Sequence, residues 1–209
     1  RVLLGDIAEI LNGFAFESSK FSKDKGYPLL RIRDIGDTKT QAFYTGDFDK
    51  AYIVKPGDLV IGMDGDFNCA KWAGEPALLN QRVCKVTIKS TDYNPNFLYY
   101  VLPGYLKAIN DHTSSVTVKH LSSRTVSEIP LPFPPLPEQE RIVAKIEELF
   151  TQLEAGTSAL ERVQAGLRRY KASVLRQEWT ERYSEMVKTM MSFLKVGKMS
   201  NWLMYCLSH

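Results

Sequence analysis

Polar side chains able to recognise nucleic acid recur in five loops along the chain, which read FESSKFSKDKGY, RIRD, DFNCAKW, LNQRV and TSSVTVKHLSSR. Asparagine and glutamine pair bidentately with adenine and arginine with guanine, while lysine and hydroxyl side chains commonly hold phosphates. The two arginines of RIRD are expected on one face of a strand, because they lie two residues apart. The candidate DNA-binding residues are Lys20, Lys23, Arg31, Arg33, Asn68, Lys71, Gln81, Arg82, Thr117, Lys119 and His120.

Each of these residues, taken singly, is more typical of an ordinary solvated surface. Asn80, in LNQRV, is more typical of a buried side chain that braces a turn. Gathered on one scaffold, however, the five loops predict a binding module. The residue types alone do not distinguish a DNA partner from a protein partner.

The stretch PGDLVIGMDGD places carboxylates at both ends of a short strand, at Asp58, Asp64 and Asp66. A nuclease needs clustered carboxylates for Mg²⁺ together with a nearby lysine. The sequence Asp-Gly-Asp is more typical of a turn, in which Gly65 takes a positive φ and the aspartates bond local backbone. We therefore expect a turn here rather than a metal site.

Motifs of common catalytic sites are absent from the sequence, including the phosphate-binding G-x-x-x-x-G-K-[ST] loop, the G-x-S-x-G nucleophile elbow and a glycine-rich dinucleotide turn. No C-x-x-C pair exists, and the histidines lack the spacing of a zinc site. We expect a non-catalytic chain without cofactor or metal. The chain's histidines are His112, His120 and His209, and its cysteines are Cys69, Cys84 and Cys206.

Composition is that of an ordinary globular protein, with 209 residues, 44% hydrophobic and 24% charged. The net charge is only +3, and it divides as 16 − 15 = +1 over residues 1–137 and 11 − 9 = +2 over 138–209. Any basic surface must therefore arise by local clustering. The scattered cysteines, the lack of an apolar run of ~18 residues, and an N-terminus too short and acidic for a secretion signal predict a cytoplasmic protein.

Residues 1–137 are interrupted every few residues by turn signals such as KPGD, MDGD and AGEP, between short runs rich in Val, Ile, Tyr and Phe. RVCKVTIK alternates as a strand with one buried face does. Helical segments are expected at 4–11 and at 96–110, around Pro103-Gly104. The pattern predicts an α+β fold, with a β-rich target-binding domain over 1–137.

Five prolines within 130–137 predict a stiff extended strap, and a long helix is expected from 138 to 178. Apolar residues along that helix alternate in steps of four and three, which is a heptad seam. The seam predicts a coiled coil, although a helix packed on its own domain is the alternative. The seam residues are Ile142, Ile146, Leu149, Leu153, Leu160, Val163, Leu167, Tyr170 and Val174.

Gly156 occupies one seam position and is expected to mark a kink or a close helix–helix approach. The seam loses its frame at 177–181, where a second helix or a bent continuation is expected. We assign 179–209 to a C-terminal helical tail whose role the sequence does not indicate.

Three segments together resemble a known family: LGDIAEILNGFAF, VKPGDLVIGMDGDFNCAKWAGEPALLNQRVCKV and SVTVKHLSSRTVSEIPLPFPPLPEQERIVAKIEELFTQLEAG. They are similar to a target recognition domain and its following helix in specificity subunits of Type I restriction–modification systems. The resemblance covers roughly residues 2–176, and the PPLPEQ junction followed by IVAKIEELF is its most specific part. In the family's middle segment, LNQRV is expected to be a strand.

The resemblance implies a non-catalytic subunit that binds the major groove of double-stranded DNA and carries methyltransferase and restriction subunits. Family members usually hold two recognition domains, each reading half of a split target, and two long helices that pair antiparallel as a spacer. The resemblance therefore implies that the long helix of this chain forms an antiparallel coiled coil. This chain shows one domain and one helix, so it is either a half-size subunit that forms a homodimer or the first half of a longer subunit.

Two other classes compete with this interpretation. A standalone nuclease of the same fold is disfavoured, because the only acidic neighbour of the DTK at 37–39 is Asp34, which is too near in the sequence. A protein-interaction adaptor that acts through its coiled coil alone remains the third possibility.

Overall fold

The computed structural model describes residues 1–112 and 119–195. Its contacts divide the chain into two units, Arg1–Glu147 and Glu148–His209. Thr117, Cys206, His209 and the end of the expected tail lie outside the described residues. Among the residues that are described, no helix is both long and apolar enough to cross a membrane.

Unit 1 is built on a four-stranded sheet whose order is β2-β10-β7-β8 and whose paired strands all run antiparallel. The strand β10 confirms the predicted alternation, since Cys84 and Val86 enter the core beneath α2. Its opposite face is also covered at one point, because Val83 belongs to a second apolar cluster. The strands are β2 (Ala8–Asn12), β10 (Val83–Ile88), β7 (Leu59–Gly62) and β8 (Cys69–Lys71).

A second, five-stranded sheet has the order β3-β5-β4-β9-β6. The pairing of β4 with β9 is parallel, whereas the other neighbours in this sheet are antiparallel. Short 3₁₀ turns, η1 (Ser18–Lys20), η2 (Ile32–Asp34) and η3 (Lys50–Tyr52), interrupt the chain between strands. The strands are β3 (Phe21–Ser22), β4 (Tyr27–Leu30), β5 (Phe43–Tyr44), β6 (Ile53–Val54) and β9 (Ala77–Leu79).

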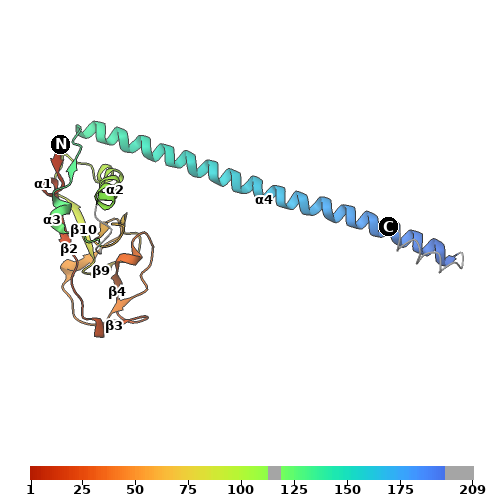
Figure 1. Ribbon diagram of the computed structural model, residues 1–209, viewed down its shortest axis with the longest axis horizontal. Helices are drawn as coiled ribbons and strands as arrows, with labels where there is room; N and C mark the ends of the chain where they lie inside the picture. Colours follow the sequence, from red (N-terminus) through yellow and green to blue (C-terminus); the bar gives the residue numbers. More distant parts are fainter. Residues whose placement is uncertain (113–118, 196–209) are drawn as a thin grey trace. The chain divides into compact units, whose positions relative to one another are not determined.

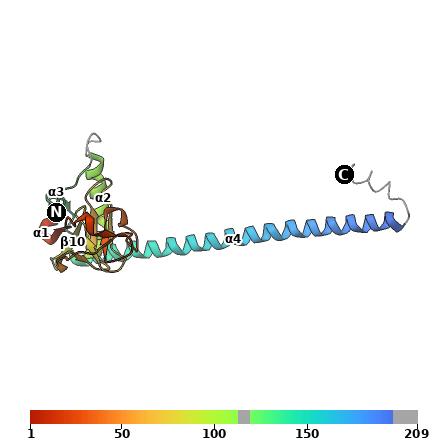
Figure 2. The same cartoon turned by 90° about the horizontal axis from the view of Figure 1, so that it is seen from below.

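The helices of unit 1 cover the four-stranded sheet, with α2 (Pro95–His112) beside β10 (Figures 1 and 2). The predicted helix at 96–110 is confirmed, and Pro103 lies inside it. Asn94 caps its start, because the Asn94 side chain accepts hydrogen bonds from the N–H groups of Asn96 and Phe97 at 2.8 and 3.2 Å. The remaining short helix here is α3 (Ser123–Ser127).

The helix expected at 4–11 is wrong beyond its first turn. The structure has α1 (Leu4–Ile7) and then β2, because residues 8–12 pair in full register with β10. Backbone pairing across the sheet thus overrides a local pattern that is ambiguous between helix and strand. The mixture of a β-rich unit with helices nevertheless confirms the predicted α+β class.

The proline strap is extended at its start, where β11 (Pro130–Leu131) pairs with β1 (Val2–Leu3), whereas its last two residues, Leu136 and Pro137, already belong to the following helix. The helix α4 (Leu136–Lys195) follows. Gln139 fixes its first turn, although this side chain is fully buried. The Gln139 amide donates to the carbonyls of Asp92 and Pro134 at 2.9 and 2.8 Å and accepts from the Asn94 N–H at 2.8 Å. Every polar atom of this buried amide is therefore satisfied.

Within unit 2, α4 continues through Gly156 and past the expected end at residue 178, up to Lys195. The seam residues of this unit are exposed, from 37% at Val174 to 72% at Leu160. The first two belong to unit 1, where Ile142 packs against the core and Ile146 is half-buried. The apolar stripe thus continues along one face of α4. Within the described residues of unit 2, this face is exposed.

Candidate nucleic-acid interface

The turn between β7 and β8 presents polar side chains at one end of the four-stranded sheet. Gly65 has a φ of +74°, as predicted for a turn at Asp-Gly-Asp. The Gly62 N–H donates to the carbonyl of Asn68 at 2.8 Å, which closes the turn and leaves the Asn68 side chain exposed. The buried ring of Phe67 anchors the turn to the core.

The LNQRV segment is a turn between β9 and β10 rather than the expected strand. The Asn80 side chain accepts from the Gln81 N–H at 2.8 Å, and the Asn80 carbonyl accepts from the Val83 N–H at 2.9 Å. These local bonds reverse the chain, because a short polar side chain competes with the strand ladder. Asn80 therefore braces a turn, and Gln81 and Arg82 are exposed on it.

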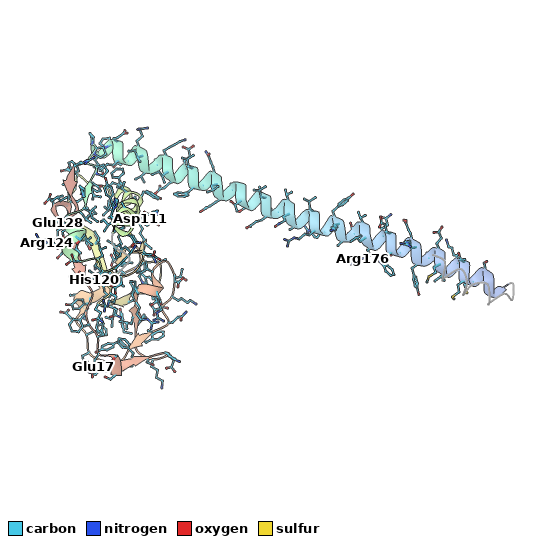
Figure 3. All side chains as sticks on the ribbon, viewed as in Figure 1. Glu17, Asp111, His120, Arg124, Glu128 and Arg176 are labelled. Carbon is cyan, nitrogen blue, oxygen red and sulfur yellow. The ribbon has the colours of Figure 1, made fainter. Side chains whose placement is uncertain are left out.

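A third segment, residues 119–121, runs beside the β7–β8 turn. Its backbone is fixed by hydrogen bonds from the Gly65 N–H to the Lys119 carbonyl (3.2 Å) and from the Leu121 N–H to the Met63 carbonyl (2.7 Å). The Lys119 ammonium donates to the carbonyl of Asn110 at 2.8 Å. His120 is exposed beside it, and Figure 3 shows its place on unit 1.

These three segments come from distant parts of the sequence and meet at one end of β7. The Met63 N–H also donates to the Arg82 carbonyl at 2.9 Å, which ties the β9–β10 turn to the same point. Asp64 lies between them, with carboxylate oxygens 3.0 Å from Arg82 Nη1 and 2.7 Å from His120 Nδ1. We call the polar set of these segments the turn cluster, in which Lys119 is half-buried and the other four residues are exposed: Asn68, Gln81, Arg82, Lys119 and His120.

Arg31 and Arg33 do not share a strand face, contrary to the prediction. The chain leaves β4 at Leu30 and enters η2, because the buried Asp34 carboxylate accepts from the Arg31 N–H at 3.0 Å. This turn packs on the end of β7, where a Cβ on Gly62 would meet Ile32 Cγ1 at 2.9 Å. The two arginines therefore lie on a turn that adjoins the cluster.

Three further candidates lie elsewhere or are already bonded. Lys71, on β8, donates to Asn96 at 2.7 Å, and its ammonium lies 4.8 Å from the ring centroid of Tyr99. Lys20 pairs with Glu17, and this hydrogen-bonded carboxylate raises the pKa of Lys20 above its ordinary value. In Figure 3 Glu17 lies apart from His120, so Lys20 and the nearby Lys23 do not belong to the turn cluster.

Phe14 is a residue that our sequence reasoning missed as a surface feature. Its ring is 48% exposed, and its carbonyl accepts from the Gln81 N–H at 3.0 Å. The sequence feature that accompanies this position is the preceding glycine. The backbone at Gly13 passes so close to the Asn80 turn that a Cβ there would lie 2.0 Å from the Asn80 carbonyl oxygen. An aromatic ring therefore stands beside the polar turn cluster.

Asp58 is used structurally, since its carboxylate accepts from the Lys55 N–H at 2.8 Å and pairs with Lys85 at 3.5 Å. Over residues 1–112 and 119–195, no group of three or more His, Cys, Asp or Glu side chains is placed to hold a metal ion. Burial raises the pKa of both the Cys69 and the Cys84 thiols to about 12. These two cysteines are therefore packing residues at neutral pH.

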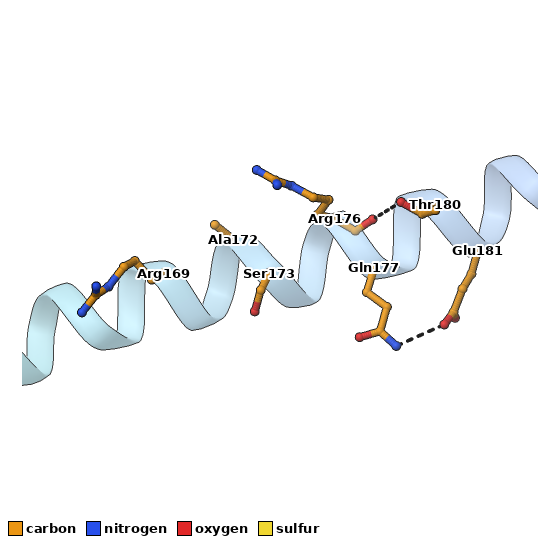
Figure 4. Close-up of a pocket in the computed structure, with 7 residues that line it drawn as sticks. All are labelled: Arg169, Ala172, Ser173, Arg176, Gln177, Thr180 and Glu181. Carbon is orange, nitrogen blue, oxygen red and sulfur yellow. Dashed lines mark hydrogen bonds between the residues drawn. The ribbon is translucent and has the colours of Figure 1, made fainter.

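A shallow hollow on α4 carries no site chemistry. Its lining side chains come from consecutive turns of this one helix (Figure 4), and the bonds among them are local, as between Gln177 and Glu181. It is a space between the side chains of an exposed helix face.

Comparison with known proteins identifies the family. A model of the Type I restriction modification DNA specificity domain matches residues 2–162. The chain belongs to the Type I restriction–modification specificity family. The resemblance carried by the PPLPEQ junction and the LNQRV segment is thereby confirmed.

The relatives agree in sequence and in fold. The specificity subunit of the EcoBI Type I restriction enzyme of Escherichia coli is 48% identical over 186 residues, covering 88% of this chain and 39% of that protein. A chain from a structure of a type I restriction–modification assembly has a TM-score of 0.62 at 22% identity, covering 80% of this chain and 42% of that one.

The HsdS subunit of Thermoanaerobacter tengcongensis has a TM-score of 0.56 at 21% identity, covering 74% of this chain and 38% of that one. At these identities the solved structures establish a shared fold. This chain spans about two fifths of the length of its relatives, 39% of the E. coli specificity subunit.

Proposed function

We propose that this chain is the DNA-reading part of a Type I specificity subunit, in which unit 1 reads one half of a split target. The turn cluster carries this proposal, because it gathers amide, guanidinium, ammonium and imidazole groups on adjoining turns. Such groups can read base edges in the major groove. The family assignment supplies the class of partner, double-stranded DNA.

The predicted contacts divide by the kind of information they would supply. Gln81, Arg82, Asn68 and His120 are proposed to contact base edges. Lys20 and Lys23 are proposed to contact phosphates, which orient a protein on DNA without reading sequence. Arg31 and Arg33, on the adjoining turn η2, are proposed to extend the surface along the DNA.

The exposed seam of α4 supports a second part of the proposal. Leu153, Leu160 and Leu167 are each more than 60% exposed, which is costly for a stripe of apolar side chains in water. We infer that this face pairs antiparallel with a second long helix and so spaces two reading domains. The second helix comes from another copy of the chain or from the other half of a longer subunit.

We further infer that the chain has no catalysis of its own, acts in the cytoplasm, and serves as a scaffold for methyltransferase and restriction subunits. The family assignment supports this, together with free cysteines at Cys69 and Cys84, which suit a reducing compartment.

A selection from a library of random-sequence DNA duplexes tests the reading role. The purified full chain is expected to retain duplexes that share a short sequence, and Arg82→Ala is expected to relax the preference at one or two positions by about tenfold. Lys23→Ala, a loss of one charge away from the turn cluster, is the control. It should weaken retention evenly over all sequences. Equal effects of the two substitutions on the selected sequence would contradict the proposed reading surface.

A further inference from the structure

Asp64 is the carboxylate on which two of the proposed DNA contacts converge. Its Oδ2 lies 3.0 Å from Arg82 Nη1, and its Oδ1 lies 2.7 Å from His120 Nδ1. The Asp64 side chain is only 22% exposed, whereas those of Arg82 and His120 are each 54% exposed. The carboxylate is therefore set behind two donors that reach further into solvent.

The backbone around Asp64 is fixed without help from its side chain. Neighbouring Met63 donates to the Arg82 carbonyl at 2.9 Å and accepts from the Leu121 N–H at 2.7 Å. Gly65, on the other side, donates to the Lys119 carbonyl at 3.2 Å. Three segments of the fold thus remain joined when the carboxylate is changed, so the side chain has a separable role.

We propose that Asp64 is a positioning residue that sets which hydrogen-bonding edges Arg82 and His120 present to DNA. This inference rests on the proposed function. It also gives a reason for the aspartate itself, because a turn beside Gly65 would form equally well with asparagine.

The chemistry of the carboxylate fixes the polarity of both partners. An ionised carboxylate only accepts hydrogen bonds, so His120 must carry its proton on Nδ1, and Nε2 of the neutral ring is left as an acceptor. Arg82 places one amino group on Asp64 and keeps its other N–H donors for a ligand. Asp64 thereby holds the Nε2 acceptor of His120 beside the remaining N–H donors of Arg82.

Asp64→Asn disturbs this arrangement with almost no change of size. If the new amide turns its NH₂ toward His120, the ring must carry its proton on Nε2, and the exposed nitrogen changes from acceptor to donor. If the NH₂ turns toward Arg82, two hydrogen-bond donors face each other and the contact with the guanidinium is lost. Asp66→Asn is the matched control, since Asp66 is an exposed aspartate of the same turn and the substitution removes the same charge.

The experiment compares the full-length wild-type chain, Asp64→Asn and Asp66→Asn in selections from a random-sequence duplex library. We expect Asp64→Asn to change the preference about tenfold or more at the base positions next to Arg82 and His120, and to leave the other positions alone. Asp66→Asn is expected to retain the wild-type profile. Equal profiles for all three proteins, or a uniform loss at every position with Asp64→Asn, would overturn the inference.

The outcomes separate this inference from the proposed function. A wild-type chain that selects no sequence overturns both, whereas a selective wild-type chain with an unaltered Asp64→Asn profile overturns only the role of Asp64. Nitrogen NMR of His120 in the protein without DNA supplies an independent reading. The proton is expected on Nδ1 in the wild type and displaced in Asp64→Asn, and a wild-type His120 protonated on Nε2 alone would contradict the proposal.

Discussion

Unit 1 buries its large apolar side chains, whereas the part of α4 that lies in unit 2 exposes them. In unit 1 large residues such as Leu98, Leu102 and Ile129 are almost completely buried. In unit 2 Leu153, Leu160 and Leu167 are exposed, although their spacing is as regular as that of any core helix. The difference teaches that unit 1 completes its core by itself, while the helix has an apolar face whose proposed partner comes from a second helix.

The largest effect is expected from charged substitutions in the exposed seam of α4. Leu160→Glu together with Leu167→Glu should abolish self-association, because four leucines per pair, at ~1.5 kcal/mol or more each, would lose their burial. Light scattering is expected to give about twice 23.7 kDa for the wild type and 23.7 kDa for the variant.

Ala165→Glu with Ala172→Glu is the matched control, since both positions lie opposite the seam in the heptad frame. This control should keep the wild-type mass. If both double variants dissociate alike, charge rather than the seam decides association, and the helix-pairing proposal fails.

The next effect concerns the one stretch of α4 that belongs to unit 1. Gln139→Ala leaves the backbone groups of Asp92, Asn94 and Pro134 without this partner, and we expect a loss of about 3 kcal/mol in the free energy of unfolding. Urea denaturation of the full chain measures this loss.

Gln152→Ala, which removes an exposed glutamine bonded to Glu148 on the same helix, is the control and should cost less than about 0.5 kcal/mol. A similar small cost at Gln139 would show that the strap and helix start do not depend on this buried amide.

A smaller effect is expected from changing the length of α4, which tests the helix as a spacer. Inserting four residues after Leu153 adds about 6 Å of helix, and we expect the preferred gap in the selected DNA to grow by about two base pairs. A chain of unchanged length, in which 154–157 is replaced by Glu-Ala-Ala-Lys, serves as the control. An unchanged gap in the lengthened chain would reject the helix as a spacer.

The smallest effect concerns the core of unit 1. With pKa values of about 12, the thiols of Cys69 and Cys84 are ionised to roughly one part in ten thousand at pH 8. Because the thiolate is the reactive form, reactivity should rise only as the pH approaches 12 or as the chain unfolds. We expect peptide mass spectrometry after iodoacetamide treatment at pH 8 to find both unmodified in the folded protein and modified in urea. Rapid labelling of the folded protein would show that this core opens.

Local patterns predicted the elements whose cause is local. The alternation of β10, the helix around Pro103 and the positive φ of Gly65 all follow from short stretches of sequence. The pattern at 4–11 misled us, because pairing with β10 decides that segment. The turns at Arg31 and Asn80 depend on hydrogen bonds to nearby side chains. The strand-like sequence pattern of these two segments gave no indication of the bonds.

The candidate site was predictable as a set of residues but not as an arrangement. Asn68, Arg82 and His120 lie on three segments that only the pairing of β7 with its neighbours brings together. Nothing in the local sequence separated them from Lys20 or Lys71, which have the same general chemistry. The sequence predicts Asp64 as a turn residue, whereas its contacts with Arg82 and His120 are ones that only the folded chain reveals.

The most direct test of the account is the sequence that the full wild-type chain selects from random duplexes. Two copies paired antiparallel through α4 should retain DNA that carries the same short motif twice, inverted and separated by a constant gap. A single motif without a fixed partner would contradict the pairing of two copies of this chain through α4, and retained DNA with no common sequence would contradict the reading role of unit 1.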